Sequence, residues 1–266
     1  MNILRPKTIK ELNNFLLENK NFAFIAGGTD IVASMKKGIE KREDFIDLSL
    51  LKSELRKIEE DDNNIIIKAM TTFYDIQKNE RIKEFFPILI ETSKTIGGFT
   101  IQNMATIAGN IANASPAADS LPVLLVLDAS IILNGPNGKR EVKIDKFYKG
   151  YKNLEMNNNE FIEAIIIPKK RYKKYLFKEV GTRRAVSITK ASIAYTLDEN
   201  GSVKVASGSV AAYPVRLYNT EKFLENPDST ELLDVIKKDI APIDDIRSTG
   251  EYRLNVVNNI IKTILN

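Results

Sequence analysis

The 266-residue sequence contains no histidine and no cysteine. Without cysteine, the chain's own thiols cannot form disulfides, thiolate zinc sites or iron–sulfur ligation. Without histidine, the usual proton shuttle and the commonest metal ligand are missing. Ser-His-Asp and Cys-His mechanisms are therefore excluded. The reactive chemistry must be supplied by a bound cofactor.

The sequence also lacks a long hydrophobic run. No apolar segment approaches membrane-spanning length, and the N-terminus, MNILRPKTIKEL, has no apolar core of signal-peptide length. We therefore expect a cytoplasmic protein without a membrane span. With 43% hydrophobic and 28% charged residues, the composition is that of an ordinary globular protein, and the length allows one large or two ordinary domains.

The sequence has no strong excess of charge of either sign, because it contains 39 basic and 35 acidic residues. The net charge of +4 says little about partners. One local cluster, KKRYKK at 169–174, raises the possibility of a nucleic-acid surface because Tyr172 lies among the bases. A solvated turn after Pro168 explains the cluster better, so no nucleic-acid partner is expected.

Hydrophobic periodicity predicts the elements of the N-terminal part. Thr8 and Glu11 fit a capping box at the start of the first helix. A hairpin is predicted through Asn134 to Gly138. The patterns predict helices over 8–20, 76–94 and 117–129, a short helix ending at Gly38, and strands over 22–26, 44–49, 64–71 and 160–167.

From Tyr175 the pattern changes to alternation typical of antiparallel strands, over YLFKEVG, SITKASIAYTL and SVKVASGSVAA. Helical segments follow near Glu221, over 230–240 and over 251–265. We therefore place a domain boundary near residues 168 to 175. The order of the runs indicates an α+β fold.

A glycine-rich turn, AGGTD at 26 to 30, follows the predicted strand 22–26. Such a turn can form a nest of amide donors for an anion such as a diphosphate. Alternatively, it is a tight turn with Thr29 or Asp30 as the helix N-cap. The GxGxxG pattern and the P-loop pattern are both absent, which disfavours ordinary nicotinamide and nucleoside-triphosphate folds.

A second small-residue turn lies at Thr106 to Asn110, within a stretch from Ile96 to Asp128. Nearby polar side chains add to this locality: Asn113, Ser115, Asp119 and Ser120. Two such loops favour an extended, phosphate-bearing ligand over a merely structural pair only marginally. Asp119 could accept a hydrogen bond from a ribose or ribityl hydroxyl, or cap the following helix.

Three segments carry a resemblance to a known family: AGGTD at 26–30, TIAGNIANASPAADS at 106–120 and DIRSTGEYR at 245–253. They resemble the FAD-binding medium subunit of molybdenum hydroxylases of the xanthine, carbon monoxide and nicotinate dehydrogenase type. The resemblance implies a two-subdomain FAD-binding α/β domain of the PCMH type over 1–170, with subdomains of about 1–52 and 53–170. A C-terminal α+β flavoprotein domain with a small antiparallel sheet would follow over 171–266.

The resemblance also implies the cofactor contacts. The two loops would hold the diphosphate, Asp119 would contact the sugar portion and Ile96 would lie beside the cofactor. Lys190 aligns more loosely and could instead be an outward lysine on an edge strand. The implied cofactor-binding residues are Ala26, Gly27, Gly28, Thr29, Asp30, Ile31, Ile96, Thr106, Ile107, Ala108, Gly109, Asn110, Asp119 and Lys190. No catalytic side chain and no metal ligand is implied.

Two positions depart from the family pattern, which has Arg where Gln102 stands and Gly where Ala108 stands. Ala108 adds a methyl group that is tolerable if its φ is negative. Gln102 lacks a charge that would meet another subunit or the cofactor.

The implied function is electron relay. Electrons from a molybdopterin-binding large subunit would pass through [2Fe-2S] clusters of a small subunit to noncovalent FAD on this chain, and then to an acceptor, expected to be NAD⁺. The departures at Gln102 and Ala108 motivate an alternative, a scaffold subunit with a degenerate or absent flavin site. A free-standing flavoenzyme is a third possibility, but it would normally need an acid, a base or a substrate-binding cluster that the sequence does not offer.

Overall fold

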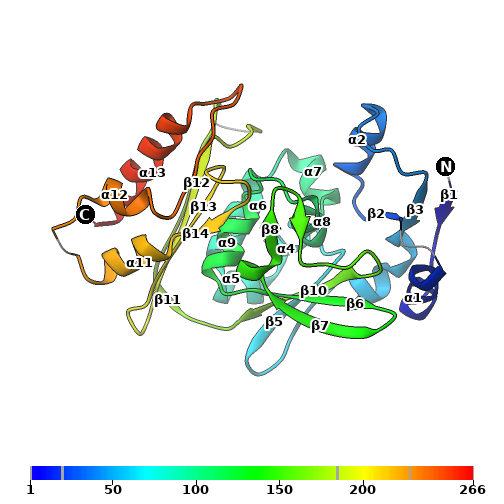
Figure 1. Ribbon diagram of the computed structural model, residues 1–266. Helices are drawn as coiled ribbons and strands as arrows, with labels where there is room; N and C mark the ends of the chain where they lie inside the picture. The colour runs from blue at the N-terminus through cyan, green and yellow to red at the C-terminus, as the bar shows by residue number, and fades with distance from the viewer. Residues whose placement is uncertain (1, 19–20, 184–185, 228, 266) are drawn as a thin grey trace.

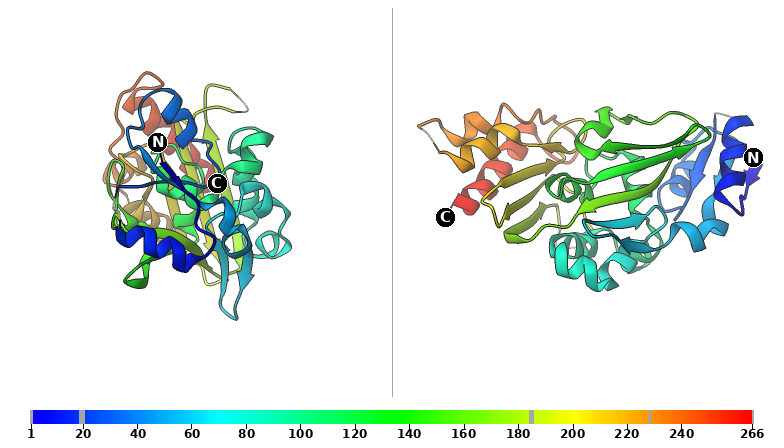
Figure 2. Two further views of the ribbon diagram at one scale, coloured as in Figure 1. Left: turned by 90° about the vertical axis from the view of Figure 1, so that its right-hand side faces the viewer. Right: turned by 90° about the horizontal axis from the view of Figure 1, so that it is seen from below.

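The protein, analysed as a computed structural model, is elongated, with three main sheets placed one after another (Figures 1 and 2). The structure describes residues 2–18, 21–183, 186–227 and 229–265. The N-terminal sheet lies at one end, a five-stranded sheet in the middle, and the last sheet with its helices at the other end. Within the described ranges, no helix combines the length and apolarity needed to cross a membrane.

The N-terminal sheet is built from three short parallel strands. Helix α1 (Ile9–Glu18) begins where Thr8 Oγ1 accepts a hydrogen bond from the Glu11 N–H at 3.1 Å, as predicted. Leu12 and Leu16 of this helix are buried against Ile46. The sheet order is β1-β3-β2, with β1 (Asn2–Leu4), β2 (Ala23–Ile25) and β3 (Asp44–Asp47).

The middle sheet has five strands, and all neighbours are antiparallel. Two short helices, η1 (Leu48–Leu51) and α3 (Lys52–Leu55), lead into it from β3. The predicted hairpin is confirmed as β6 and β7. The order is β4-β5-β10-β6-β7, with β4 (Ile58–Glu60), β5 (Asn64–Lys68), β6 (Ser130–Gly135), β7 (Gly138–Lys143) and β10 (Phe161–Pro168).

The single helix predicted over 76–94 is wrong, because three helices occupy this region: α4 (Phe73–Lys78), α5 (Glu80–Phe85) and α6 (Pro87–Thr95). Asn79 has an extended backbone and its side chain accepts a hydrogen bond from the N–H of Ile82, which starts α5 anew. Pro87 forces Phe86 out of the helical region and begins α6.

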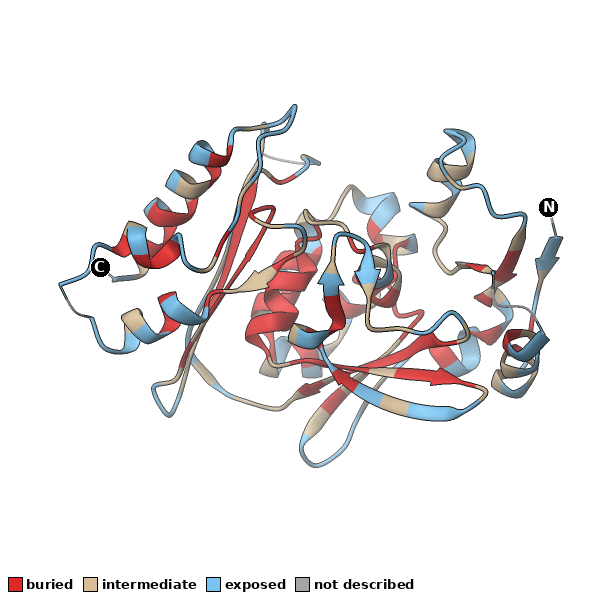
Figure 3. Cartoon of the chain, in the orientation of Figure 1, coloured by how far each residue is buried: buried red, intermediate tan, exposed pale blue. Residues whose placement is uncertain are grey.

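The stretch after α6 is also more helical than its small residues indicate, with α7 (Phe99–Met104) and α8 (Ile107–Asn113) separated by two residues. Ala114 has a left-handed backbone, φ 51°, and ends α8. The helix predicted over 117–129 is shorter, α9 (Ser120–Val126), and every one of its residues is buried. Figure 3 shows this helix at the centre of the molecule.

The C-terminal part confirms the predicted α+β fold with an antiparallel sheet. One sheet face packs on α9 through Ala194 and Ala206, and the other packs on the last helices through Ile193, Val205 and Ile261. Successive residues of one strand thus point to opposite faces of the sheet and pack in two different hydrophobic cores. The strands are β11 (Tyr172–Val180), β12 (Ala191–Asp198), β13 (Val203–Gly208) and β14 (Val215–Arg216), and the helices are α11 (Tyr218–Glu225), α12 (Leu232–Ile236) and α13 (Gly250–Leu265). The short elements α10 (Ile144–Phe147), β8 (Tyr148–Gly150) and β9 (Asn153–Leu154) lie between β7 and β10.

The basic segment at 169–174 is not a free basic surface. Lys169 Nζ lies 3.1 Å from a Glu60 carboxylate oxygen, Lys170 Nζ lies 3.0 Å from Asp128, and Arg171 lies 3.7 Å from Glu84. Tyr172 already belongs to β11. The first three residues of the segment thus have ion-pair partners within the chain, whereas Lys173 and Lys174 are exposed.

Candidate functional site

The first glycine-rich loop lies between β2 and the short helix α2 (Ile31–Lys36). Gly28 has φ 74°, a left-handed backbone that a side chain would strain. Among the residues that the structure describes, none accepts a hydrogen bond from the N–H groups of Gly28, Thr29, Asp30 or Ile31. Asp30 is the N-cap of α2, but its side chain makes no capping hydrogen bond. Asp30 therefore stands at the N-cap position, as the alternative interpretation predicted, but its side chain does not cap the helix, and the four N–H groups have no partner among the described residues.

The second loop joins α7 to α8. Thr106 is the N-cap of α8, and its Oγ1 accepts a hydrogen bond from the Gly109 N–H at 3.1 Å. A hydrogen bond from the Ile107 N–H to the Thr71 carbonyl, at 3.1 Å, ties the backbone of this loop to the residues before α4. Ile107 itself is fully buried, so it belongs to the core and does not line the site. Ala108, Gly109 and Asn110 belong to the helix α8, which fixes the position of their backbone.

The two loops touch at Gly27. A Cβ at this position would lie 1.8 Å from the Met104 carbonyl oxygen and 2.6 Å from the Met104 carbonyl carbon. No side chain fits there, so glycine is required for the close approach of the two backbones. The glycine thus serves the meeting of the loops, a reason that the sequence alone does not reveal.

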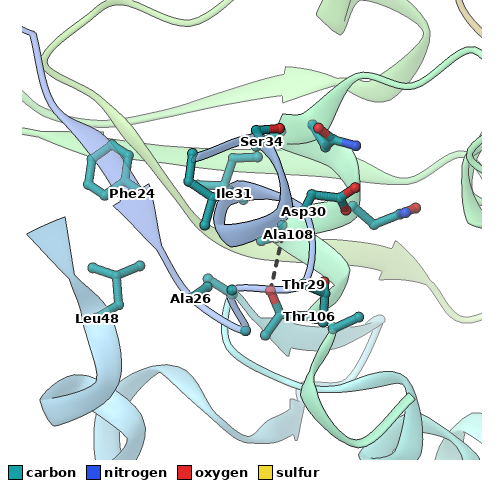
Figure 4. Close-up of a pocket in the computed structure, with 18 of the residues that line it drawn as sticks. Phe24, Ala26, Thr29, Asp30, Ile31, Ser34, Leu48, Thr106 and Ala108 are labelled. Carbon is teal, nitrogen blue, oxygen red and sulfur yellow. Dashed lines mark hydrogen bonds between the residues drawn. The ribbon is translucent and has the colours of Figure 1, made fainter. Parts of the chain in front are cut away.

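Together the loops line a cavity of about 420 Å³, within the size range of small-molecule sites. In Figure 4, Thr29 and Asp30 of the first loop lie close to Thr106 and Ala108 of the second. Thirteen of the lining residues fall in the two loop regions and are neutral or small, with one exception, Asp30. The cavity wall from these regions is formed by Ala26, Gly27, Gly28, Thr29, Asp30, Ile31, Ala105, Thr106, Ala108, Gly109, Asn110, Ala112 and Asn113.

Two basic residues at the cavity were not predicted. Arg42 follows α2 and donates to the Phe22 carbonyl at 2.9 Å and to Glu40. This hydrogen bond from Arg42 holds the pKa of Glu40 at about 2, so the Glu40 carboxylate is ionised and fixes the guanidinium. Lys152 enters from the turn between β8 and β9. Neither residue stands in a recognisable motif, and only the fold brings them to the loops.

Lys152 forms no ion pair within the described part of the chain. If it neutralises a bound anionic ligand, Lys152→Met is expected to weaken FAD binding about two- to fivefold, the magnitude of an exposed charge pair. The loss should shrink at high salt because exposed charges are screened. Fluorescence titration with FAD measures both effects. Lys146→Met, an exposed lysine that does not line the cavity, is the matched control, and equal losses in both variants would contradict the assignment.

The remaining residues implied by the resemblance lie outside this cavity. Asp119 is buried, and its Oδ2 accepts a hydrogen bond from Thr189 at 2.9 Å, while its side chain does not cap α9. Asp119 is thus the N-cap residue of α9, as the alternative predicted, but it makes no capping hydrogen bond through its side chain. Ile96 is the C-cap of α6 and packs on the main core.

Lys190 precedes β12, whose neighbours are β11 and β13, so it does not stand on an edge strand. Its Nζ lies 5.2 Å from the centre of the Tyr252 ring of α13.

The two departures from the family pattern have separate outcomes. Ala108 lies in the helix α8 and is not among the residues with positive φ, so its methyl group meets no backbone strain. Gln102 is buried, and its Nε2 donates to the Lys94 carbonyl at 2.9 Å at the end of α6. Gln102 therefore faces inward, toward its own chain, and not toward a partner.

The arrangement supports binding rather than side-chain catalysis. Among the described residues, no group of three or more acidic side chains could hold a metal ion. The cavity instead offers amide donors without a partner among the described residues, a loop contact that only glycine permits, and the charge of Lys152, while Arg42 is paired with Glu40, which also lines the cavity. These features fit the anionic diphosphate of an extended nucleotide cofactor such as FAD.

Comparison with known proteins agrees with this fit. The sequence profile described as "FAD binding domain in molybdopterin dehydrogenase" matches residues 1–170, and that of the "CO dehydrogenase flavoprotein C-terminal domain" matches residues 177–266. The chain is 33% identical to the glyceraldehyde dehydrogenase medium chain of Sulfolobus acidocaldarius, over 96% of this chain and 93% of that one. It is 28% identical to the xanthine dehydrogenase FAD-binding subunit of Escherichia coli O157:H7, over 98% and 93%. A crystal structure of Cu,Mo-CO dehydrogenase superposes with a TM-score of 0.91 at 26% identity, covering 99% of this chain and 95% of that one.

Proposed function

Because this chain belongs to the family of FAD-binding medium subunits of the molybdenum hydroxylases, we propose that it relays electrons from the iron–sulfur clusters of a partner subunit to NAD⁺. A molybdopterin-binding large subunit and a [2Fe-2S] small subunit would complete the complex. The observation that carries the proposal is the apposition of the two loops at Gly27, beside a cavity lined by four residues whose N–H groups have no partner among the described residues.

We assign the residues as follows. The N–H groups of the first loop would bind the diphosphate, and the second loop would bind it from the opposite wall, with Thr106 holding Gly109 in place. Asn110 lines the cavity, and its Oδ1 accepts a hydrogen bond from Ser120 at 2.6 Å, which orients its amide group. Asp119, Ile96 and Lys190 are proposed cofactor contacts on the strength of the family pattern.

When bound, FAD supplies the redox chemistry, since a flavin accepts single electrons and can deliver a hydride. The chain's own task is to bind, orient and shield. Because it contains no histidine and no cysteine, the usual side chains for covalent flavin attachment are missing, and noncovalent binding is proposed. We also propose a cytoplasmic location.

The domain assignment stays part of the proposal. The FAD-binding domain would span 1–170, with subdomains of about 1–52 and 53–170, and the flavoprotein domain would span 171–266. In support, β10 ends at Pro168 in the five-stranded sheet, and β11 begins at Tyr172 in the four-stranded sheet.

A scaffold role without a working flavin site finds no support in the two departures that suggested it. Ala108 has ordinary helical geometry, and Gln102 bonds within its own chain. The geometry at these two positions therefore supports a working flavin site, which the electron-relay role needs.

Anaerobic addition of NADH to the FAD-loaded chain is expected to bleach the flavin absorption band, because a site that reduces NAD⁺ also runs in reverse. Dithionite is the reference, since it reduces an accessible flavin without a nucleotide site. Bleaching by dithionite but not by NADH would refute NAD⁺ as acceptor and favour a quinone or a ferredoxin.

A further inference from the structure

Arg253 of α13 is the last residue of the segment DIRSTGEYR, and none of the described residues of this segment lines the cavity. Its side chain is almost completely buried. Its Nη1 donates to the carbonyl oxygen of Lys190 at 2.9 Å and to that of Ser209 at 2.7 Å, and its Nη2 lies 2.7 Å from Asp245. Nε and Nη2 have no hydrogen-bond partner among the described residues, so the two carbonyl groups and the charge of Asp245 are what hold this buried guanidinium.

The two carbonyl groups held by Arg253 stand at the ends of neighbouring strands. Lys190 immediately precedes β12, and Ser209 immediately follows β13. Ser209 has φ 62°, its N–H donates to the Pro116 carbonyl at 2.8 Å, and its Oγ donates to the Thr189 carbonyl at 2.9 Å. Arg253 therefore fixes both the segment that ends at Lys190 and a residue that bonds across to the loop before α9.

Thr189 makes a second contact with that loop. It is buried, and its Oγ1 has two carboxylate acceptors within reach, Asp119 Oδ2 at 2.9 Å and Glu179 Oε2 at 3.2 Å, of which Asp119 is the nearer. The other oxygen of Asp119, Oδ1, is buried and has no hydrogen-bond partner among the described residues. An unmatched carboxylate oxygen of this kind lacks the partner that a ligand hydroxyl would supply.

We propose that Arg253 is a positioning residue for the flavin site: it holds the backbone on both sides of Thr189, and so keeps the Thr189 hydroxyl on Asp119. This inference rests on the proposed function, in which Asp119 meets the sugar portion of FAD. The alternative is that Arg253 only stabilises the C-terminal domain.

The surroundings of Asp119 provide a readout specific to this role. Burial and the charge of Glu179 on β11 raise the pKa of Asp119 to about 7, and the hydrogen bond from Thr189 lowers it. Ser192 at the start of β12 is the other hydroxyl that acts on the carboxyl, while Lys190 Nζ is turned to Tyr252. Loss of the Thr189 hydrogen bond therefore raises the pKa of Asp119 further.

An ionised carboxylate is the stronger acceptor for a sugar hydroxyl. FAD affinity of the full chain is thus expected to rise as the pH increases through about 7. Both Arg253→Met and Thr189→Val should move this midpoint to higher pH. They should also weaken FAD binding at neutral pH, about tenfold for Arg253→Met and about three- to tenfold for Thr189→Val, since the first loosens and the second removes the Thr189 hydrogen bond to the buried Asp119 carboxylate.

The test is a fluorescence titration with FAD from pH 6 to 9, with thermal unfolding of the flavin-free chain measured in parallel. Arg247→Met is the matched control, because Arg247 lies in the same segment and shares the partner Asp245 with Arg253, but its side chain is 42% exposed and has no other ion pair among the described residues; its FAD affinity and midpoint should not change. A lower thermal stability of Arg253→Met with unchanged affinity and midpoint would overturn the proposal.

If Arg253→Met does not fold, Thr189→Val decides, since valine keeps the shape of threonine and removes only the hydroxyl; an unchanged midpoint there would equally overturn the proposal. A wild-type chain that bound no FAD would instead refute the proposed function itself.

Discussion

Replacement of Gly27 by valine is expected to abolish FAD binding while leaving the overall fold in place. The new Cβ would have to occupy a position 1.8 Å from the Met104 carbonyl oxygen. Because the obstacle is backbone, no side-chain rotation relieves the clash, and the first loop must move away from the second. Both walls of the cavity would then separate, and the amide donors would no longer converge on one ligand. We expect at least a hundredfold weaker FAD binding, since a misplacement of about 1 Å in a preorganised site is sufficient for such a loss.

The measurement is the flavin absorbance retained by the purified variant after gel filtration, with circular dichroism to verify the secondary structure. Gly98→Ala is the control. Gly98 precedes α7 with φ −93°, and a Cβ there would meet no atom within 4 Å. Full flavin occupancy in Gly27→Val would show that the diphosphate is not held between these loops.

The second large effect, on stability, is expected at Asp128, whose carboxylate forms ion pairs with basic residues of the C-terminal part of the chain. Its carboxylate lies 3.0 Å from both Lys170 and Arg216 and also pairs with Lys204. The Lys204 and Arg216 side chains are largely buried, at 13% exposure each. Asp128→Asn keeps the shape and tolerates the left-handed backbone, φ 55°, but removes the charge.

Asp128→Asn should lower the free energy of unfolding by about 2–4 kcal/mol, because breaking a partly buried ion cluster from one side leaves uncompensated cations. Chemical denaturation measures this change. Asp234→Asn is the control, since Asp234 forms an exposed pair with Lys237, and we expect a loss of less than about 1 kcal/mol there. Equal losses in the two variants would mean that the Asp128 cluster does not hold the domains together.

Much of the architecture follows from local sequence patterns. The alternation after Tyr175 predicts the antiparallel C-terminal sheet, and Asn134 to Gly138 predicts the hairpin of β6 and β7. Patterns failed where a side chain interrupts a helix from within. Asn79 and Pro87 break the region 76–94 into three helices. Asn79 caps the start of α5, and Pro87 forces the backbone of Phe86 out of the helical conformation.

The site itself was only partly predictable. The two small-residue loops are visible in the sequence, and the structure brings them together in one cavity. The need for Gly27 arises from Met104, which is 77 positions away, so no local pattern could reveal it. Arg42 and Lys152 reach the cavity from solvent-exposed turns with no motif of their own. Cofactor contacts of Ile96 and Lys190 stay predictions, since neither lines the cavity.

The most direct test of the whole account is the FAD content of the purified 266-residue chain after reconstitution. The account predicts a stoichiometry near one FAD per chain, released intact by acid or heat because the attachment is noncovalent. A correctly folded chain that retains no flavin absorbance after incubation with excess FAD would contradict it.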